Sequence, residues 1–378
     1  MSENEINILF TGDFCPVNRI EKLALGGKFG AIFNDFIDIL HGNDLNVTDL
    51  ECPLTVGTSC RKKIGPHQKA HPECIEALKC GDIGLVALAN NHIMDYGSEG
   101  ISDTLRLCKS KDINFVGVGS SPEKASEPFT MVIKNRRIAI FNYAENEFIS
   151  ASDGDWNCNP IDNQNMYYDL HQAREANDFI FVFVHAGNEY FKLPSPRLQR
   201  LFRYLVDLGA DAVIASHTHV FSGYEIYKSK PIFYGLGNFI YDWPGKRNME
   251  WNRGFGVKFS LSERVDFELI PFLQGNEQPG VFCLNNIERD EFFREINMLN
   301  KMISDEKMLE SEFTKNCRSI FPMYDGYIEP YFGKFISKLR HLGFFPRLMG
   351  KRKRLLLLNI IRCESHRDVL LKILGQYE

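Results

Sequence analysis

Short apolar runs rich in β-branched and aromatic residues alternate with stretches of helical periodicity through the first 240 residues of this chain. A near-continuous apolar run indicates a strand that is buried on both faces, and such strands followed by helices are typical of layered α/β domains. The alternation therefore predicts an α/β fold with a largely buried sheet. The expected strands are 6–10, 45–47, 83–88, 179–184 and 212–215, and the expected helices are 29–40, 72–79, 98–108 and 196–208.

The helical stretches stop after Thr218, and strand-like runs then follow one another. Consecutive strands predict hairpins added to the same core, and we expect Ser262-Glu263 to form the turn of the last one. The expected strands here are 223–227, 231–234, 254–261 and 264–270.

Two stretches interrupt the regular pattern. The segment 145–165 is rich in Asn and Asp and too long for a routine connection, which indicates either a lid or binding loop or a variable surface insertion. A turn-rich linker at 274–280 precedes helical patterns that continue to the end of the chain. We therefore expect one domain at 6–272 and a mostly helical, basic C-terminal region at 285–378.

The net charge of −5 hides a gradient along the chain. Residues 334–378 hold 11 Lys and Arg against 3 Asp and Glu, so this tail is +8 and the remainder is −13. Apolar residues around the basic run 351–354 are typical of amphipathic helices that lie on anionic membrane surfaces. The alternative is a helical subdomain that packs on the core. Nucleic acid is excluded as a partner because the acidic remainder would repel a phosphate backbone.

The sequence also predicts where the protein resides. The opening residues MSENEINILF lack the basic and apolar regions of a signal peptide. The apolar run 355–361 is far shorter than the roughly 20 residues that span a bilayer. Ten cysteines are scattered without a C-x-x-C pair, which fits reduced thiols. We expect a cytoplasmic protein that is peripheral at the inner membrane face if the tail binds lipid.

Residue types that bind metals follow the expected strands, at the point where each strand ends. Sheets of α/β proteins build their sites at these carboxyl ends. A His-x-His pair is the strongest single signal, because at strand spacing both imidazoles face the same side. Oxygen and nitrogen ligands without a thiolate suit Mn, Fe or Zn. The residues are, in chain order, Asp13, Glu51, Asn91, His92, His185, His217 and His219.

Seven short motifs between residues 6 and 270 closely resemble the bacterial capsule-synthesis CapA family. Its members are associated with poly-gamma-glutamate capsules and are distant relatives of calcineurin-like metallophosphoesterases. The resemblance implies a layered α/β/β/α sandwich of the metallophosphoesterase type, and the last hundred residues fall outside it. The motifs are Gly12-Asp13, Asn46-x-x-x-x-Glu51, Asn90-Asn91-His92-x-x-Asp95-x-Gly97, His185-Ala-Gly-Asn-Glu189-Tyr190, Gly209-Ala-Asp211, His217-Thr-His219-Val and Gly235-Leu-Gly-Asn238-Phe239.

The resemblance also implies a set of metal ligands. Glu51 stands where metallophosphoesterases place a carboxylate that bridges two metals. Each metal would take further ligands of its own. These are Asn91, His185 and His217 for one metal, and Asp13 and His219 for the other.

Three more residues gain expected roles from the resemblance. His92 matches the histidine that protonates the leaving oxygen in phosphoester cleavage. Asp95 would orient His92 through a carboxylate–imidazole hydrogen bond. Glu189 belongs to the CapA pattern and has no counterpart in ordinary phosphoesterases.

The first motif departs from the phosphoesterase pattern. That pattern begins Asp-x-His, whereas this chain has Asp13-Phe14-Cys15, so one imidazole is missing. We therefore expect one tight metal site and one weak site. A Cys15 thiolate would replace the imidazole, or Cys15 is a buried and inert thiol.

Together these features predict a metal-dependent hydrolase that acts on a phosphoester or a related bond. Bound cations lower the pKa of water to about 7 and neutralise charge on a phosphoryl group. The expected partner is an envelope polymer or its phosphorylated precursor, in capsule or envelope-polymer biosynthesis. Two alternatives stay open: a catalytically silent capsule-assembly factor, and a metal-dependent amide hydrolase that acts on poly-gamma-glutamate.

Overall fold

Two β-sheets face each other in the computed structural model, which describes residues 5–149, 156–328, 339, 342–343 and 350–374. The first sheet has eight strands in the order β16-β15-β14-β1-β2-β3-β4, with β13 paired to β1. Its strands are β1 (Ile6–Cys15), β2 (Leu45–Leu50), β3 (Ile83–Ala87), β4 (Asn114–Val116), β13 (Asn238–Tyr241), β14 (Arg253–Leu261), β15 (Val265–Gln274) and β16 (Val281–Cys283).

The second sheet has six strands in the order β11-β12-β10-β9-β7-β6. Its central strands β7, β9, β10 and β12 are parallel, like β1 to β4 of the first sheet. The strands are β6 (Phe129–Ile133), β7 (Arg136–Ala144), β9 (Phe179–His185), β10 (Ala212–Ser216), β11 (Tyr224–Tyr227) and β12 (Lys230–Phe233), and a separate pair joins β5 (Val118–Gly119) to β8 (Asn157–Cys158).

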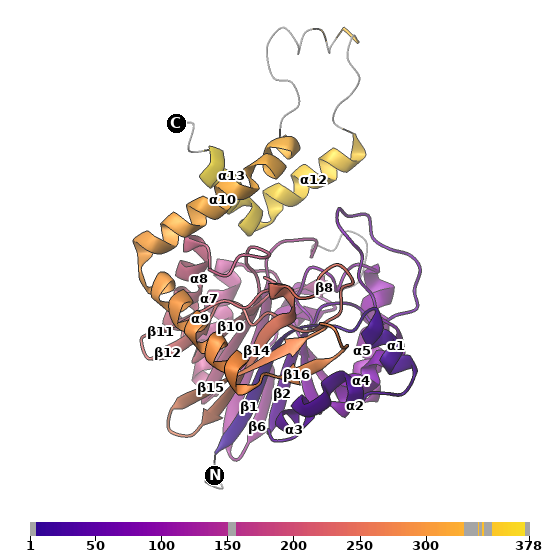
Figure 1. Ribbon diagram of the computed structural model, residues 1–378, viewed down its shortest axis with the longest axis vertical. Helices are drawn as coiled ribbons and strands as arrows, with labels where there is room; N and C mark the ends of the chain where they lie inside the picture. Colours follow the sequence, from indigo (N-terminus) through magenta and orange to yellow (C-terminus); the bar gives the residue numbers. More distant parts are fainter. Residues whose placement is uncertain (1–4, 150–155, 329–338, 340–341, 344–349, 375–378) are drawn as a thin grey trace.

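Helices cover the outer faces of both sheets, which confirms the predicted layered α/β/β/α sandwich (Figure 1). Side-chain caps begin the helices over the second sheet: Asp162 accepts two backbone N–H groups of α7, and Ser195 accepts one of α8 before Pro196. The helices are α1 (Arg19–Leu25), α2 (Gly30–Phe33), α3 (Ile37–Leu40), α4 (Ile75–Cys80), α5 (Gly97–Ser110), α6 (Pro122–Ser126), α7 (Asn163–Ala176) and α8 (Pro196–Asp207), with 3₁₀ turns at Asn34–Phe36, Pro72–Cys74 and Glu250–Asn252.

Two local predictions are wrong. The helix expected at 29–40 is broken at Asn34, which has a left-handed φ of 48° and donates from its amide to Ala31 and Val281 carbonyls. The last hairpin, expected to turn at the two residues Ser262-Glu263, has a three-residue turn at 262–264, because Leu261 pairs with Val265. The first difference depends on a contact with a distant residue and the second on the register of the two strands. The periodicity of the sequence reveals neither.

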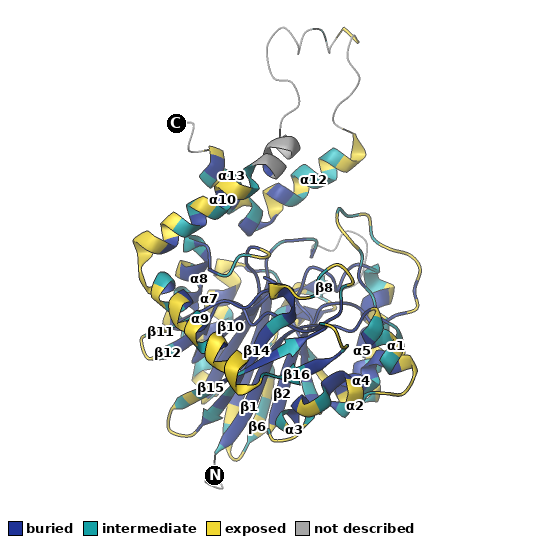
Figure 2. Ribbon diagram, viewed as in Figure 1, coloured by how far each residue is buried: buried dark blue, intermediate teal, exposed yellow. Residues whose placement is uncertain are grey.

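Phenylalanines fill the space between the two sheets. Phe10 of β1, Phe181 of β9 and Phe259 of β14 are fully buried, with ring centroids 5.0–5.7 Å apart. Such aromatic pairs add about 0.5–1.5 kcal/mol beyond the burial of their area. This packing holds the two sheets together, and Figure 2 shows their strands as buried.

The C-terminal region begins with a helix that joins the sandwich. α9 (Asn286–Ser304) starts at a capping box of Asn285 and Glu288 and lies along β11. Its buried side chains, Phe292 among them, belong to the main hydrophobic core. The linker at 274–280 leads into β16, which pairs with β15, so the first sheet extends to Cys283.

The remaining helices form a layer at the end of the sandwich opposite the N-terminus (Figure 1). α10 (Glu306–Ile328) packs against α13 (Glu364–Leu374) through a small apolar cluster that contains Phe313 and Val369. Within α12 (Lys351–Arg362), Ile360 is the one buried residue. No helix in the described ranges is both long and apolar enough to cross a bilayer.

The tail 334–378 is predicted to bind a membrane surface. Part of it lies outside the described ranges, namely 334–338, 340–341, 344–349 and 375–378. In the described part, Leu358 and Ile361 of α12 are exposed beside the basic run 351–354. Membrane binding stays a prediction.

The phenylalanine packing predicts a large stability effect. Phe181→Ala is expected to lower the free energy of unfolding by about 3–5 kcal/mol, because it removes a buried ring and leaves a cavity. Val132→Ala on β6, where the side chain is 64% exposed, serves as the control and is expected to change it by less than about 0.5 kcal/mol. Urea unfolding measures both, and equal effects would contradict the packing described here.

Candidate metal centre

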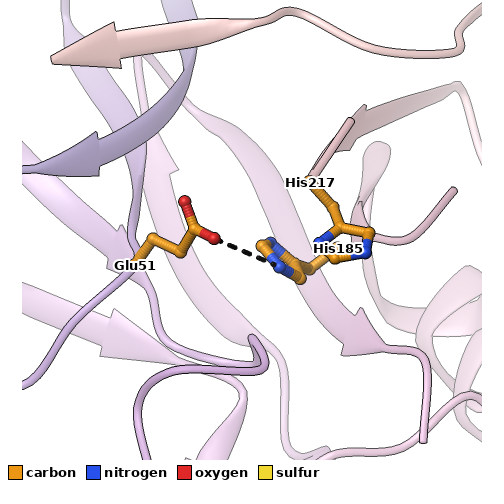
Figure 3. Close-up of side chains that lie close together, drawn as sticks. All are labelled: Glu51, His185 and His217. Carbon is orange, nitrogen blue, oxygen red and sulfur yellow. Dashed lines mark ion pairs between the residues drawn. The ribbon is translucent and has the colours of Figure 1, made fainter. Parts of the chain in front are cut away.

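The predicted ligands meet where strands of both sheets end. Asp13 lies near the end of β1 and Glu51 follows β2 in the first sheet. His185 ends β9 and His217 follows β10 in the second sheet. Figure 3 shows the Glu51 carboxylate facing His185, with His217 beside it. The site therefore joins the carboxyl ends of two facing sheets.

A glycine allows the backbone to approach this site closely. A Cβ atom at Gly12 would lie 1.8 Å from the carbonyl oxygen of Gly237, so any other residue would push the two segments apart. The approach places β13 beside β1, with Asn238 opposite Asp13. The Asn238 side-chain oxygen then lies 3.0 Å from His219 Nδ1 and directs the other ring nitrogen into the site.

Glu51, His185 and His217 form one group of potential ligands, with one atom of each within 4.8 Å of the others. Glu51 Oε1 lies 3.9 Å from His185 Nε2, and the two histidine rings have centroids 4.5 Å apart. Asn91 Oδ1 lies 3.1 Å from the same His185 nitrogen. The structure thus brings together the four residues expected for the first metal.

Asp13, Glu51 and His219 form a second group of potential ligands, again with one atom of each within 4.8 Å of the others. His219 Nδ1 lies 3.3 Å from Asp13 Oδ2, and its Nε2 lies 3.9 Å from Glu51 Oε1. Glu51 is common to both groups, which is the position expected of a bridging carboxylate.

Several buried polar atoms of these groups lack a hydrogen-bond partner among the described residues. They are both carboxylate oxygens of Glu51 and Nδ1 of His217. Burial and the nearby carboxylates of Asp13 and Asp49 raise the pKa of Glu51 well above its ordinary value. Burial and His185 hold the pKa of His217 well below its usual range, so its ring is neutral and able to bind a metal. Atoms of this kind cost about 1–3 kcal/mol each when unsatisfied, and they fit a divalent cation.

Asp49 is a further candidate residue of the site that lies outside the strand-end set predicted from the sequence. Its Oδ2 lies 2.7 Å from His185 Nδ1 and accepts a hydrogen bond from the Ser216 hydroxyl at 2.6 Å. A carboxylate on Nδ1 keeps the Nε2 lone pair of His185 free for a metal. Its spacing from Glu51 could have pointed to Asp49, because residues two apart in extended chain face the same side.

The backbone of the His-x-His pair is strained. His217 and His219 have φ values of 94° and 57°, in the region that favours glycine. The His217 N–H donates to Asp13 Oδ1 at 3.2 Å, which helps to hold this conformation. Strained residues of this kind cost about 1–3 kcal/mol and gather at functional sites.

His92 lies at the edge of this centre and contacts Asp95, as expected. The distance from His92 Nδ1 to Asp95 Oδ2 is 2.7 Å. Lys63, which the sequence analysis does not identify, forms an ion pair with Asp95, and its Nζ lies 3.2 Å from His92 Nδ1. Burial and Lys63 lower the pKa of His92 to about 4, so the resting ring is neutral at pH 7.

The two remaining candidates lie in different surroundings. Glu189 is exposed beside the centre and lines the same cavity as His92. Cys15 is fully buried, and burial together with Cys52 and Glu51 raises the pKa of its thiol well above the ordinary value. A protonated, buried thiol is a poor metal ligand, which favours the inert interpretation.

A cavity of about 390 Å³ opens beside the centre. Asn91, His92, Glu189 and His219 line it, together with Lys63 and residues from outside the sandwich. Among the latter is His366 of α13, from the region that no motif covers. Two larger hollows, of about 580 and 730 Å³, lie over α6–α7 and α7–α8 and contain none of the predicted site residues.

Comparison with known proteins identifies relatives of this chain. It is 31% identical to the capsule biosynthesis protein CapA of Bacillus anthracis over 255 residues, which cover 64% of this chain and 61% of that protein. It is 28% identical to the PGA biosynthesis protein CapA of Bacillus subtilis over 64% of both chains. The chain thus matches slightly under two thirds of the length of these relatives.

A solved structure and a family description also match. A putative 5'-nucleotidase from Staphylococcus aureus gives a TM-score of 0.43 at 12% identity, over 78% of this chain and 58% of that one. The family described as bacterial capsule synthesis protein PGA_cap matches residues 7–243, well over half of the chain. As the resemblance to CapA predicts, this protein belongs to the bacterial capsule synthesis protein PGA_cap family.

Proposed function

We propose that this protein is a metal-dependent hydrolase that cleaves a phosphoester or a related bond in the biosynthesis of a capsule or another envelope polymer. The observation that carries the proposal is the fully buried carboxylate of Glu51. Both of its oxygens lack a hydrogen-bond partner among the described residues, and its Oε1 lies 3.9 Å from Nε2 of both His185 and His219. A carboxyl group buried in this way either takes up a proton or, in its charged form, is stabilised by a cation beside it. The capsule role follows from the names of the two Bacillus relatives.

Divalent cations, when bound, activate water and neutralise the charge of a phosphoryl group. Mn, Fe or Zn suits the oxygen and nitrogen donors. Glu51, Asn91, His185 and His217 would hold one cation. Asp13 and His219, with Glu51, would hold another more weakly, since Cys15 stands where an imidazole is expected.

His92 would transfer a proton to the leaving oxygen. Asp95 accepts the Nδ1 proton of its ring, which leaves Nε2 for the substrate. Lys63 keeps Asp95 paired and ionised. The ring is neutral at rest, and a phosphoester beside it adds negative charge that favours the protonated form.

Two rival functions remain outcomes of the test. A silent assembly factor is favoured by the missing imidazole at Cys15. An amide hydrolase that acts on poly-gamma-glutamate is favoured by the description of the Bacillus subtilis relative as a PGA biosynthesis protein.

Metal content gives the first test. We expect purified protein to carry close to one equivalent of Mn, Fe or Zn, because one ligand set is complete and the other lacks its imidazole. His217→Ala is expected to lose most of this metal, whereas His171→Ala, at an exposed histidine of α7, keeps it. Elemental analysis measures the content. Two equally tight metals per chain would contradict the expected weak site.

Turnover of a generic phosphodiester such as bis(p-nitrophenyl) phosphate gives the second test. His92→Asn is expected to lower turnover about 100-fold or more while metal content stays unchanged, since the residue moves a proton and binds no metal. His171→Asn is the matched control.

The outcomes separate the three functions. Equal metal loss in His92→Asn and His217→Ala would show that the division of roles is wrong. Shortening of poly-gamma-glutamate without phosphate release would favour the amide hydrolase. A metal-loaded protein that hydrolyses neither substrate would favour the assembly factor.

We also propose that the basic tail places the enzyme at an anionic membrane surface. Full-length protein is expected to sediment with vesicles that contain phosphatidylglycerol at low salt and to be released as salt rises, because such charges are screened within about 8 Å at physiological ionic strength. Replacing the basic residues of 351–354 by glutamine should weaken sedimentation. Protein that stays in the supernatant at low salt would refute the idea.

A further inference from the structure

Glu147 is a buried carboxylate that links the metal centre to the C-terminal helices. It follows β7, at the start of the long segment 145–165. One of its oxygens faces the predicted ligands, and the other faces α12 and α13. Neither the family resemblance nor the strand pattern points to it.

On the side of the metal centre, Glu147 fixes the orientation of Asn91. The Asn91 Nδ2 group donates to Glu147 Oε2 at 3.2 Å, which turns Asn91 Oδ1 toward His185 Nε2 at 3.1 Å. A carboxylate only accepts hydrogen bonds, so rotating the amide by 180° would lose this contact. Glu147 Oε2 also lies 3.6 Å from His217 Nε2. Glu147 therefore presents the oxygen of Asn91 that a cation would bind.

On the other side, the C-terminal helices hold Glu147 in place. His366 Nε2 of α13 lies 3.0 Å from Glu147 Oε1, and the Asn359 amide of α12 donates to the same oxygen at 3.3 Å. The hydroxyl of Tyr324 in α10 lies 2.5 Å from His366 Nδ1. An ionised carboxylate can only accept, so Nε2 of His366 carries a proton and donates to Glu147, while the Tyr324 hydroxyl holds the other ring nitrogen. Residues from three helices thus hold this carboxylate in place, Asn359 and His366 directly and Tyr324 through His366.

Further polar contacts fix α13 against the same segment. The Ser365 hydroxyl donates to Glu145 at 2.5 Å, and Glu364 accepts from the backbone and the side chain of Asn146 at 3.1 and 2.8 Å. Buried and partly buried hydrogen bonds of this kind are costly to break when a polar group is left without a partner. The hydrogen bonds of Glu364 and Ser365 to residues 145 and 146 therefore help to fix the position of His366.

We infer that His366 is a positioning residue of the metal centre, which acts through Glu147 on Asn91 and so makes the C-terminal helices part of the site. The inference rests on the proposed metal binding. Residues that orient a ligand typically contribute about 10–100-fold to metal affinity. In this arrangement the tail contributes to cation affinity through the orientation of Asn91.

Titration of the metal-free, full-length protein with Mn²⁺ tests the inference by calorimetry. His366→Ala is expected to weaken the dissociation constant about 10-fold or more. His366→Gln is expected to restore most of the affinity, because its amide can still donate to Glu147. Leu371→Ala, at a 65% exposed position of the same helix, is the control and should bind like the wild type.

Urea unfolding of the metal-free variants separates positioning from loss of structure. If His366→Ala does not fold, Tyr324→Phe takes its place in the test. This variant keeps the ring and removes only the hydroxyl that fixes His366, and we expect it to bind Mn²⁺ more weakly than the wild type. Wild-type affinity in a folded His366→Ala or in Tyr324→Phe would overturn the inference while leaving the proposed hydrolase intact. A wild-type protein that binds no Mn²⁺, Fe²⁺ or Zn²⁺ would overturn both.

Discussion

Three carboxylates, those of Asp13, Asp49 and Glu51, are buried together between the ends of the two sheets, and the surrounding residues are arranged to compensate their charge. Asp13 contacts His219, and Asp49 contacts His185. The two carboxylate oxygens of Glu51 have no hydrogen-bond partner among the described residues. A buried carboxylate in this position takes up a proton or binds a cation. The site is thus organised around one buried carboxyl group that carries its negative charge only when a cation lies beside it.

The sequence alone predicts the layers of the fold and the strand-end residues, because both depend on local patterns. A buried strand shows as a short apolar run, and the residues after it reach the edge where parallel strands end. Asp13, Glu51 and His185 follow this rule and lie together. The break at Asn34 does not follow it, since it depends on a contact with Val281 that is distant in the sequence. Periodicity therefore predicts one helix where the chain forms two.

The residues that sequence analysis misses share a different property. Lys63 lies in a loop without a repeating pattern, and Glu147 lies in a segment for which a lid and a surface insertion were equally good interpretations. His366 belongs to a tail whose basic charge dominates its pattern. Each reaches the site through contacts between segments far apart in the chain. Charge and periodicity describe a segment by itself, so they do not predict such contacts.

The contact between α13 and the segment 145–147 consists of hydrogen bonds and ion pairs, and α12 buries only Ile360. Regions with few buried apolar side chains open at a lower free energy than a core of packed aromatic rings. The C-terminal helices are therefore expected to exchange their amide hydrogens sooner than the strands of the sandwich. Such an opening would separate Glu147 from His366 while the two sheets stay folded. The predicted ligands thus lie on the packed sandwich, whereas the carboxylate expected to orient one of them is contacted by helices that are expected to open more easily.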